Sequence, residues 1–145
     1  MNMGGTVMVR VVSFSYRAGV PEDPWRNGGG FVFDCRGLPN PFWESGLRGF
    51  SGKDEPVVAF FREREAEIAP FLDAAESLVL QTIRVFQTDG RTRLQAAFGC
   101  TGGQHRSVYM AERLAERLRR VPGVSVEVVH LAESHWRIGG SAGAQ

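Results

Sequence analysis

The segment 99–107, with the sequence GCTGGQHRS, combines residue types that bind anions. Gly102 and Gly103 permit a close approach to the main chain, because glycine also adopts positive φ angles. An apolar run, 94–98, precedes the segment and a helical pattern of apolar residues follows it. A strand, a glycine-bearing loop and a helix direct several backbone N–H groups and the positive end of the helix dipole to one point. Arg106 adds a planar guanidinium that fits a phosphate with two hydrogen bonds, so we predict an oxyanion site.

The same segment also fits a different chemistry, centred on Cys100. The spacing C-x5-R-S from Cys100 to Ser107 resembles the signature loop of the cysteine-dependent protein phosphatases. A thiolate held at a helix N-terminus beside an arginine is a nucleophile toward phosphorus. Gly99 stands where that family usually has a histidine, and no general acid is evident, since Asp34 lies in another predicted strand. That Cys100 packs as a small apolar side chain is the structural alternative.

Length and composition are typical of a single globular domain. The 145 residues suffice to bury a core, and 43% of them are hydrophobic and 23% charged. The net charge of +1 excludes a strong overall attraction to nucleic acid or to anionic membranes. Cys35 and Cys100 form no CxxC pair or disulfide framework, and no signal peptide or membrane span is evident. We therefore expect a cytoplasmic protein that does not contact membranes.

The elements that must position the segment alternate between strands and helices. We expect strands over 7–16, 31–36, 94–98 and 124–131, and helical segments over 55–86 and 105–120. Pro70 interrupts the first helical segment, so two helices or a sharp kink are expected there. Strands separated by helices predict an α/β fold with a mostly parallel sheet flanked by helices. Asp34 and Arg36 fall on one side of their strand, near its carboxyl end, where ligands collect in open α/β sheets.

We expect one domain over 7–138, with flexible termini at 1–6 and 139–145. The glycine run at 28–30 precedes a strand instead of opening a helix, which favours a flexible connection over a phosphate cradle. Phe42 and Trp43 are large for an exposed loop, so we expect them to cover the core. The acidic stretch around Glu65 indicates a solvated surface, and we expect no metal ion or cofactor.

Three stretches of the sequence together resemble a known family. They are Ser13–Tyr16 (SFSY), 31–41 (FVFDCRGLPNP) and 99–112 (GCTGGQHRSVYMAE). In order and spacing, from about Val11 to about His130, the chain is similar to the C-terminal domain of the RapZ family of RNase adaptor proteins. Full-length members carry an N-terminal P-loop nucleotide-binding domain. This sequence contains no G-x-x-x-x-G-K-[ST], so we expect a stand-alone second domain and do not carry over ATP or GTP binding.

The resemblance implies a domain that binds a phosphorylated amino sugar and presents a structured small RNA to an endonuclease. The positions that fall on the family's sugar-phosphate pocket are Asp34, Thr101, Gly102, Gln104, His105 and Arg106, and Gly103 completes the predicted phosphate loop. The loop amides and Arg106 would take the phosphate, while Asp34 would accept protons from hydroxyl or ammonium groups. Phe42 is a departure, because some members have a histidine there. His105 is either a ligand or a buried ring that shapes the helix start.

RNA binding has weaker support in the sequence. Arg106, Arg113, Arg117 and Arg120 fall on one stripe of the predicted helix. The stripe either contacts phosphates or is a solvated face balanced by Glu112 and Glu116. Family members that bind RNA tend to end in a basic tail, which this sequence lacks.

The favoured function is thus a non-enzymatic sensor or RNase-adaptor-like domain, with the phosphatase as its enzymatic alternative. Its expected partners are a phosphorylated small molecule, with RNA or a separate nucleotide-binding chain as further candidates, and we expect a homo-oligomer.

Overall fold

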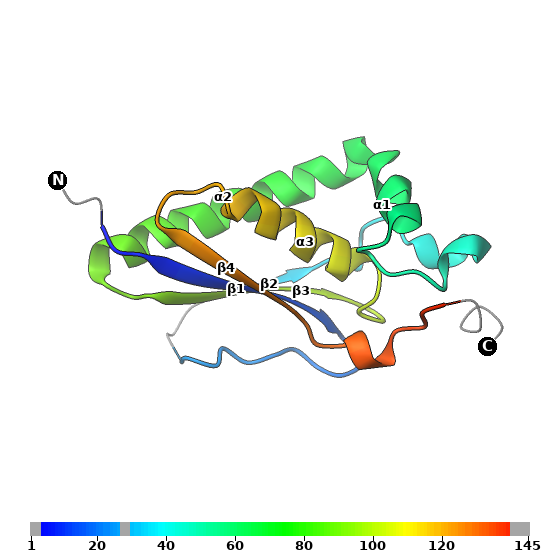
Figure 1. Cartoon of the computed structure of the whole chain (residues 1–145), viewed down its shortest axis with the longest axis horizontal. Coiled ribbons are helices and arrows are strands. Elements are labelled where there is room, and N and C mark those ends of the chain that lie inside the picture. Colours follow the sequence, from blue (N-terminus) through cyan, green and yellow to red (C-terminus); the bar gives the residue numbers. More distant parts are fainter. Residues whose placement is uncertain (1–3, 27–29, 140–145) are drawn as a thin grey trace.

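The computed structural model of the chain describes residues 4–26 and 30–139 (Figure 1). Four strands form one sheet in the order β2-β3-β1-β4, and every neighbouring pair is parallel. The strands are β1 (Val7–Ser15), β2 (Phe31–Asp34), β3 (Arg93–Cys100) and β4 (Val124–His130). The predicted α/β fold is confirmed. The predicted flexible ends at 1–3 and 140–145, and residues 27–29 of the glycine connection, lie outside the described residues.

Three helices cover one face of the sheet (Figure 1). They are α1 (Glu55–Arg62), α2 (Glu65–Asp89) and α3 (Arg106–Leu118), and short 3-10 turns lie at Pro41–Trp43, Ser45–Leu47 and Glu133–His135. Helix α3 is the amphipathic element of the three, and its Leu114 and Leu118 are fully buried in the core between helices and sheet. Within the described residues, no helix is long and apolar enough to cross a bilayer.

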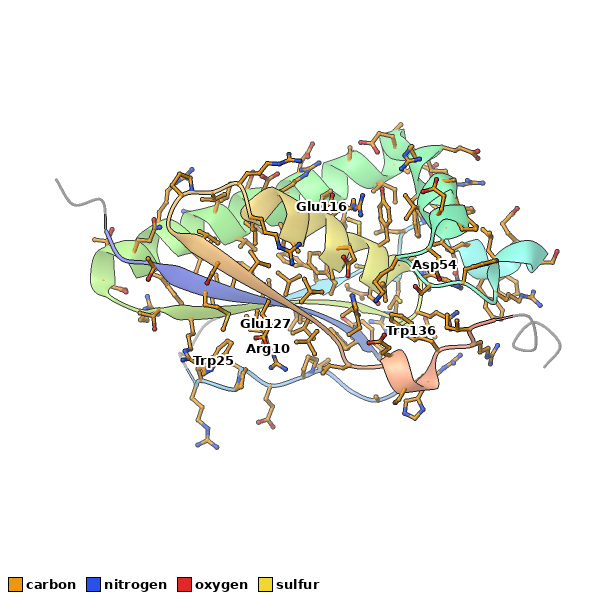
Figure 2. All side chains as sticks on the ribbon, viewed as in Figure 1. Arg10, Trp25, Asp54, Glu116, Glu127 and Trp136 are labelled. Carbon is orange, nitrogen blue, oxygen red and sulfur yellow. The ribbon has the colours of Figure 1, made fainter. Side chains whose placement is uncertain are left out.

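The opposite face of the sheet is covered by the connection from β1 to β2. In Figure 2, Arg10 of β1 and Trp25 of this connection both lie on that face. Gln95, a buried residue of β3, donates from its side chain to the Glu22 carbonyl oxygen at 2.9 Å and so fixes the connection to the sheet. A second, smaller apolar cluster centred on Val12 and Phe14 fills the space beneath. Because both faces are covered, β1 and β3 are buried along most of their length.

The path of the connections determines where this sheet can bind a ligand. The connection from β1 to β2 runs on the face opposite the helices, whereas those leaving β2 and β3 run on the helical face (Figure 1). β1 and β3 are neighbours, so adjacent strands send their connections to opposite sides. At such a switch point, the carboxyl ends of the strands open a crevice, which is the common ligand site of open α/β sheets.

The expected break at Pro70 is wrong. The chain breaks at residues 63–64, and α2 continues through Pro70. A proline there removes one backbone hydrogen bond, to the carbonyl of Ala66. Since Ala66 is exposed, water can take the place of that donor. Ile68 and Leu72, on either side of the proline, are both buried, and their packing holds the helix together across it.

Two smaller expectations are also wrong. Trp43 is 73% exposed, because Pro41 occupies the buried position of that 3-10 turn. Helix α3 ends at Leu118, so Arg120 lies in the turn that follows it. Pro122 disfavours helical geometry in the residue before it, which accounts for the early end.

Candidate functional site

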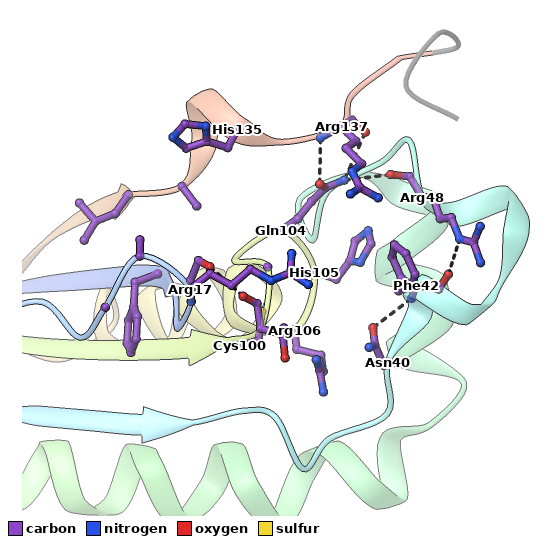
Figure 3. A pocket seen from close by; sticks show the side chains of 18 of the residues that line it. Arg17, Asn40, Phe42, Arg48, Cys100, Gln104, His105, Arg106, His135 and Arg137 are labelled. Carbon is purple, nitrogen blue, oxygen red and sulfur yellow. Dashed lines mark hydrogen bonds between the residues drawn. The ribbon is translucent and has the colours of Figure 1, made fainter. Parts of the chain in front are cut away.

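A cavity of about 860 Å³ opens at the switch point between β1 and β3 (Figure 3). Ser15 contributes from the end of β1, and Cys100 and Thr101 contribute from the end of β3. The Ser15 hydroxyl donates to the Thr101 carbonyl oxygen at 2.7 Å, which ties the two strand ends together. The cavity has the size of pockets that hold small molecules, and it is several times larger than a phosphate ion.

Most of the residues predicted from the sequence meet at this cavity. Those that line it are Cys100, Thr101, Gly102, Gln104, His105 and Arg106. Gly103 supports the loop from behind, with φ at 69° and no room for a side chain. A Cβ there would lie 2.8 Å from the Ala132 Cβ and 3.0 Å from the Ser15 nitrogen. Glycine is therefore required at this position for the loop to rest against the end of β1.

Asp34 lies outside the lining of the cavity. Its carboxylate accepts from Nε and Nη2 of Arg36 at 2.9 and 2.8 Å, and this pairing lowers the pKa of Asp34. The Arg36 guanidinium in turn stacks over the Tyr16 ring at 3.7 Å. The predicted shared side of Asp34 and Arg36 is thus observed, and the carboxylate forms an ion pair with its neighbour.

Arg106 is a buried cation, with 6% of its surface exposed. Its Nη1 donates to the carbonyl oxygens of Arg36 and Leu38, at 2.7 and 3.4 Å. Its Nε is buried and has no partner among the described residues. A buried donor without an acceptor is unfavourable by about 1–3 kcal/mol. Nε of Arg113 on α3 is buried and unpartnered in the same way.

Cys100 is 2% exposed and its sulfur contacts Ser107. The Ser107 backbone N–H donates to Sγ at 3.4 Å, and the Ser107 hydroxyl lies 3.1 Å from it. Gly99, where the phosphatases have a histidine, is packed against aromatic rings, and a Cβ there would overlap Phe14. Among the described residues, no aspartate or glutamate lines the cavity, so its wall provides no carboxylic general acid.

His105 lines the cavity and also anchors the loop. Its Nε2 lies 2.8 Å from the Phe50 carbonyl oxygen, and because a carbonyl only accepts, Nε2 carries the proton. Burial lowers the pKa of the ring, which is therefore neutral near pH 7. The neighbouring Gln104 side chain donates to the carbonyl oxygens of Arg48, Phe50 and Arg137, and accepts from the Arg137 N–H. These contacts connect the loop to two distant segments of the chain.

Three further arginines of the cavity were not identified from the sequence. They are Arg17, Arg48 and Arg137. Arg17 had a usable signal, because it lies two residues after the end of β1, whose carboxyl end must meet that of β3 in a parallel sheet. Arg48 and Arg137 carry no local signal, since tertiary contacts with Gln104 bring them to the rim.

The arginines farther along α3 have acidic partners. Nη1 of Arg117 lies 2.7 Å from both Asp73 and Glu76 of α2. Arg113 pairs with Glu116 at 3.2 Å. The sequence indicated Glu112 and Glu116 of the same helix as the balancing acids. The shortest ion pairs, those of Arg117, are instead formed with carboxylates of the neighbouring helix α2.

The fold and the site define a class of protein: a parallel α/β domain with an arginine-lined cavity on a strand–glycine loop–helix. The chain matches the family profile described as the RapZ C-terminal domain over residues 7–133, and it belongs to this family.

The chain is similar to curated proteins called nucleotide-binding proteins. One from Laribacter hongkongensis is 46% identical over 79% of this chain and 39% of its own length. One from Thioalkalivibrio sulfidiphilus is 39% identical over 88% of this chain and 42% of its own. One from Bifidobacterium adolescentis is 44% identical over 85% of this chain and 37% of its own. The chain thus spans about two fifths of the length of these relatives.

Proposed function

We propose that this domain is a regulatory sensor that binds a small phosphorylated metabolite and is not itself an enzyme. Membership of the RapZ C-terminal family supports a regulatory or adaptor role. The observation that carries the ligand class is the buried guanidinium of Arg106, which lines the cavity together with the glycine loop. The phosphate would sit against Thr101 and Gly102, at the N-terminus of α3, with Arg106 beneath it.

The resemblance to RapZ domains makes amino-sugar phosphates the first ligands to test. The same resemblance indicates two candidate macromolecular partners for the ligand-bound domain: a structured RNA and a separate nucleotide-binding chain. The relatives' name concerns proteins more than twice as long as the matched part, and this sequence lacks the P-loop motif, so we assign no nucleotide to the cavity.

Gly102→Ala is a sharp test of the phosphate site. A Cβ at Gly102 would meet nothing within 4 Å, so the added methyl group occupies free space without straining the fold. We expect glucosamine 6-phosphate and inorganic phosphate to bind about tenfold or more weakly in calorimetry, because the methyl blocks charge-assisted hydrogen bonds.

Gly46→Ala is the matched control, since its Cβ is equally unobstructed and Gly46 does not line the cavity. Equal affinities in Gly102→Ala and Gly46→Ala, with unchanged melting temperatures, would show that phosphate does not bind at this loop.

A cysteine-dependent phosphatase is the second candidate function. The Ser107 N–H that donates to the Cys100 sulfur favours it, since such a contact stabilises a thiolate. The missing carboxylic acid disfavours it. We expect no hydrolysis of p-nitrophenyl phosphate above a Cys100→Ser control. Turnover that Cys100→Ser abolishes while the protein stays folded would replace the sensor function with the phosphatase.

A further inference from the structure

The two cysteines of the sequence meet at the carboxyl ends of β2 and β3. The register of these strands places Asp34 opposite Gly99. Cys35 and Cys100 are the next residues on each side, and the Cys35 N–H donates to the Gly99 carbonyl oxygen at 2.7 Å, which extends the pairing to them. The two residues are therefore neighbours across adjacent strands, although 65 positions separate them in the sequence.

Both cysteine side chains lie on the helical side of the sheet. Side chains alternate along a strand, so Cys35 shares a side with Phe33, and Cys100 shares it with Phe98. Phe33 and Phe98 are opposite each other in the register, with ring centroids 5.1 Å apart, and the cysteines form the next pair in the same core cluster. Neighbouring strands lie about 4.7–4.9 Å apart, which is within the range of about 4.4–6.8 Å for the Cα atoms of a disulfide.

The two thiols differ in access and in chemical state. Cys100 lines the cavity, whereas Cys35 is fully buried and does not (Figure 3). The Ser107 N–H donates to Sγ of Cys100 at 3.4 Å, a contact that stabilises negative charge on the sulfur. Burial, and after it the nearby Cys100 sulfur, raises the pKa of Cys35, which stays a thiol. A small oxidant that enters the cavity therefore meets Cys100 first.

We propose that Cys100 and Cys35 form a redox-sensitive pair that a hydroperoxide converts into a disulfide. The Cys100 thiolate attacks one oxygen of hydrogen peroxide and the O–O bond breaks, which gives a sulfenic acid on Cys100 and a hydroxide ion. The Cys35 sulfur then attacks the Cys100 sulfur and the S–O bond breaks. The hydroxyl group leaves with the Cys35 proton as water. The peroxide takes up the two electrons that the thiols lose, and a thiol reductant returns them.

The bond would form at the base of the glycine loop. Thr101, the residue after Cys100, lines the cavity, and the Arg36 carbonyl, next to Cys35, accepts from Arg106 at 2.7 Å. The disulfide would join these two segments covalently, beside the contact that Arg106 already makes between them. Its formation requires no phosphate ligand, so this inference goes beyond the proposed function.

Peptide mapping of the oxidised full chain tests the pair. The folded protein is treated with hydrogen peroxide, denatured in an alkylating agent and digested without reduction. We expect most of the wild-type chain to lose both free thiols and to give one cross-linked peptide that contains Cys35 and Cys100, and dithiothreitol should restore both thiols. Cys35→Ala removes the second thiol, so the sulfenic acid on Cys100 should persist and be captured by dimedone. In the matched variant, Cys100→Ala, Cys35 should stay unmodified.

Three results for the wild-type protein would overturn the pair. They are a sulfinic acid on Cys100 beside a free Cys35, two free thiols after treatment, and disulfides between two copies of the chain. The wild-type map needs no variant, so a variant that fails to fold does not affect it. The comparison of Gly102→Ala with its control tests the proposed function separately, and none of these three results changes its outcome.

Discussion

Arginines gather in two regions of this domain, the cavity and the outer part of α3, and their surroundings differ. Arg17, Arg48 and Arg137 have no acidic partner among the described residues, whereas Arg117 contacts two carboxylates of α2. Carboxylates of the described residues therefore leave the positive charge of the cavity uncompensated, whereas they pair with Arg113 and Arg117 on the helix surface. The comparison teaches that arginine spacing alone does not identify an anion site. Acids on neighbouring elements decide whether the charge is available.

The strongest test of this difference compares the variants Arg106→Ala and Arg117→Ala. Loss of the Arg106 guanidinium should weaken sugar-phosphate binding by about 1.5–3 kcal/mol, the range for a hydrogen bond to a charged group. Arg117→Ala should leave the affinity unchanged, because its charge is already paired. Calorimetry measures both. Arg106 also donates to the Arg36 carbonyl oxygen, so its loss affects the fold as well as the site. Arg106→Lys keeps the charge and is the control for a folding defect. Equal losses in the Arg106 and Arg117 variants would contradict the distinction.

The buried ring of His105 predicts a pH dependence of stability. Its pKa in the folded state lies below its ordinary value of 6.5, so the unfolded chain takes up a proton first as the pH falls. The stability that the neutral ring contributes is complete above about pH 6.5 and is lost progressively below it, by about 1.4 kcal/mol for each unit of depression. The Glu112 carboxylate lies 2.7 Å from Nε2 of His130, and this hydrogen bond lowers its pKa below the ordinary 4.5, so it titrates lower still.

Urea unfolding at pH 7.5, 6.5 and 5.5 measures this dependence, with His105→Gln expected to flatten it. Glutamine can still donate to the Phe50 carbonyl. The exposed His135, changed to glutamine, is the control. A wild-type stability that stays constant down to pH 5.5 would show that burial does not suppress protonation of the ring.

The smallest expected effect is that of the α3 arginines on RNA binding. Affinity for nucleic acid depends on phosphates neutralised and counterions released, and each contact adds about 0.9 to the slope of log affinity against log salt. Because Arg113 and Arg117 are paired, we expect binding no tighter than micromolar, and little change in Arg113→Glu/Arg117→Glu. A fluorescence titration with a structured RNA at two salt concentrations tests this. Nanomolar binding at physiological salt that the double variant loses would make the α3 face an RNA site.

The strand–glycine loop–helix geometry could be predicted because it is local. A strand, two glycines and a helix in sequence order place Thr101 to Arg106 together regardless of the remaining fold. The rim could not be predicted, because contacts between distant segments, among them those of the Gln104 side chain, bring Arg48 and Arg137 to it. Pro70 was misjudged for a related reason: buried neighbours on α2 outweighed the local cost of a proline. Asp34 was placed on the correct side of its strand, but periodicity does not reveal which partner a carboxylate binds.

The central position of β1 has a consequence for synthesis of the chain. Within this domain β1 is translated before its partners β3 and β4, and Ser13 contacts His130 across 117 positions. Until residue 130 has been translated, one edge of β1 remains open to other chains. Such distant pairings slow folding. The cavity is therefore among the last features to form, because Ala132 and Arg137, which line it, follow β4 in the chain.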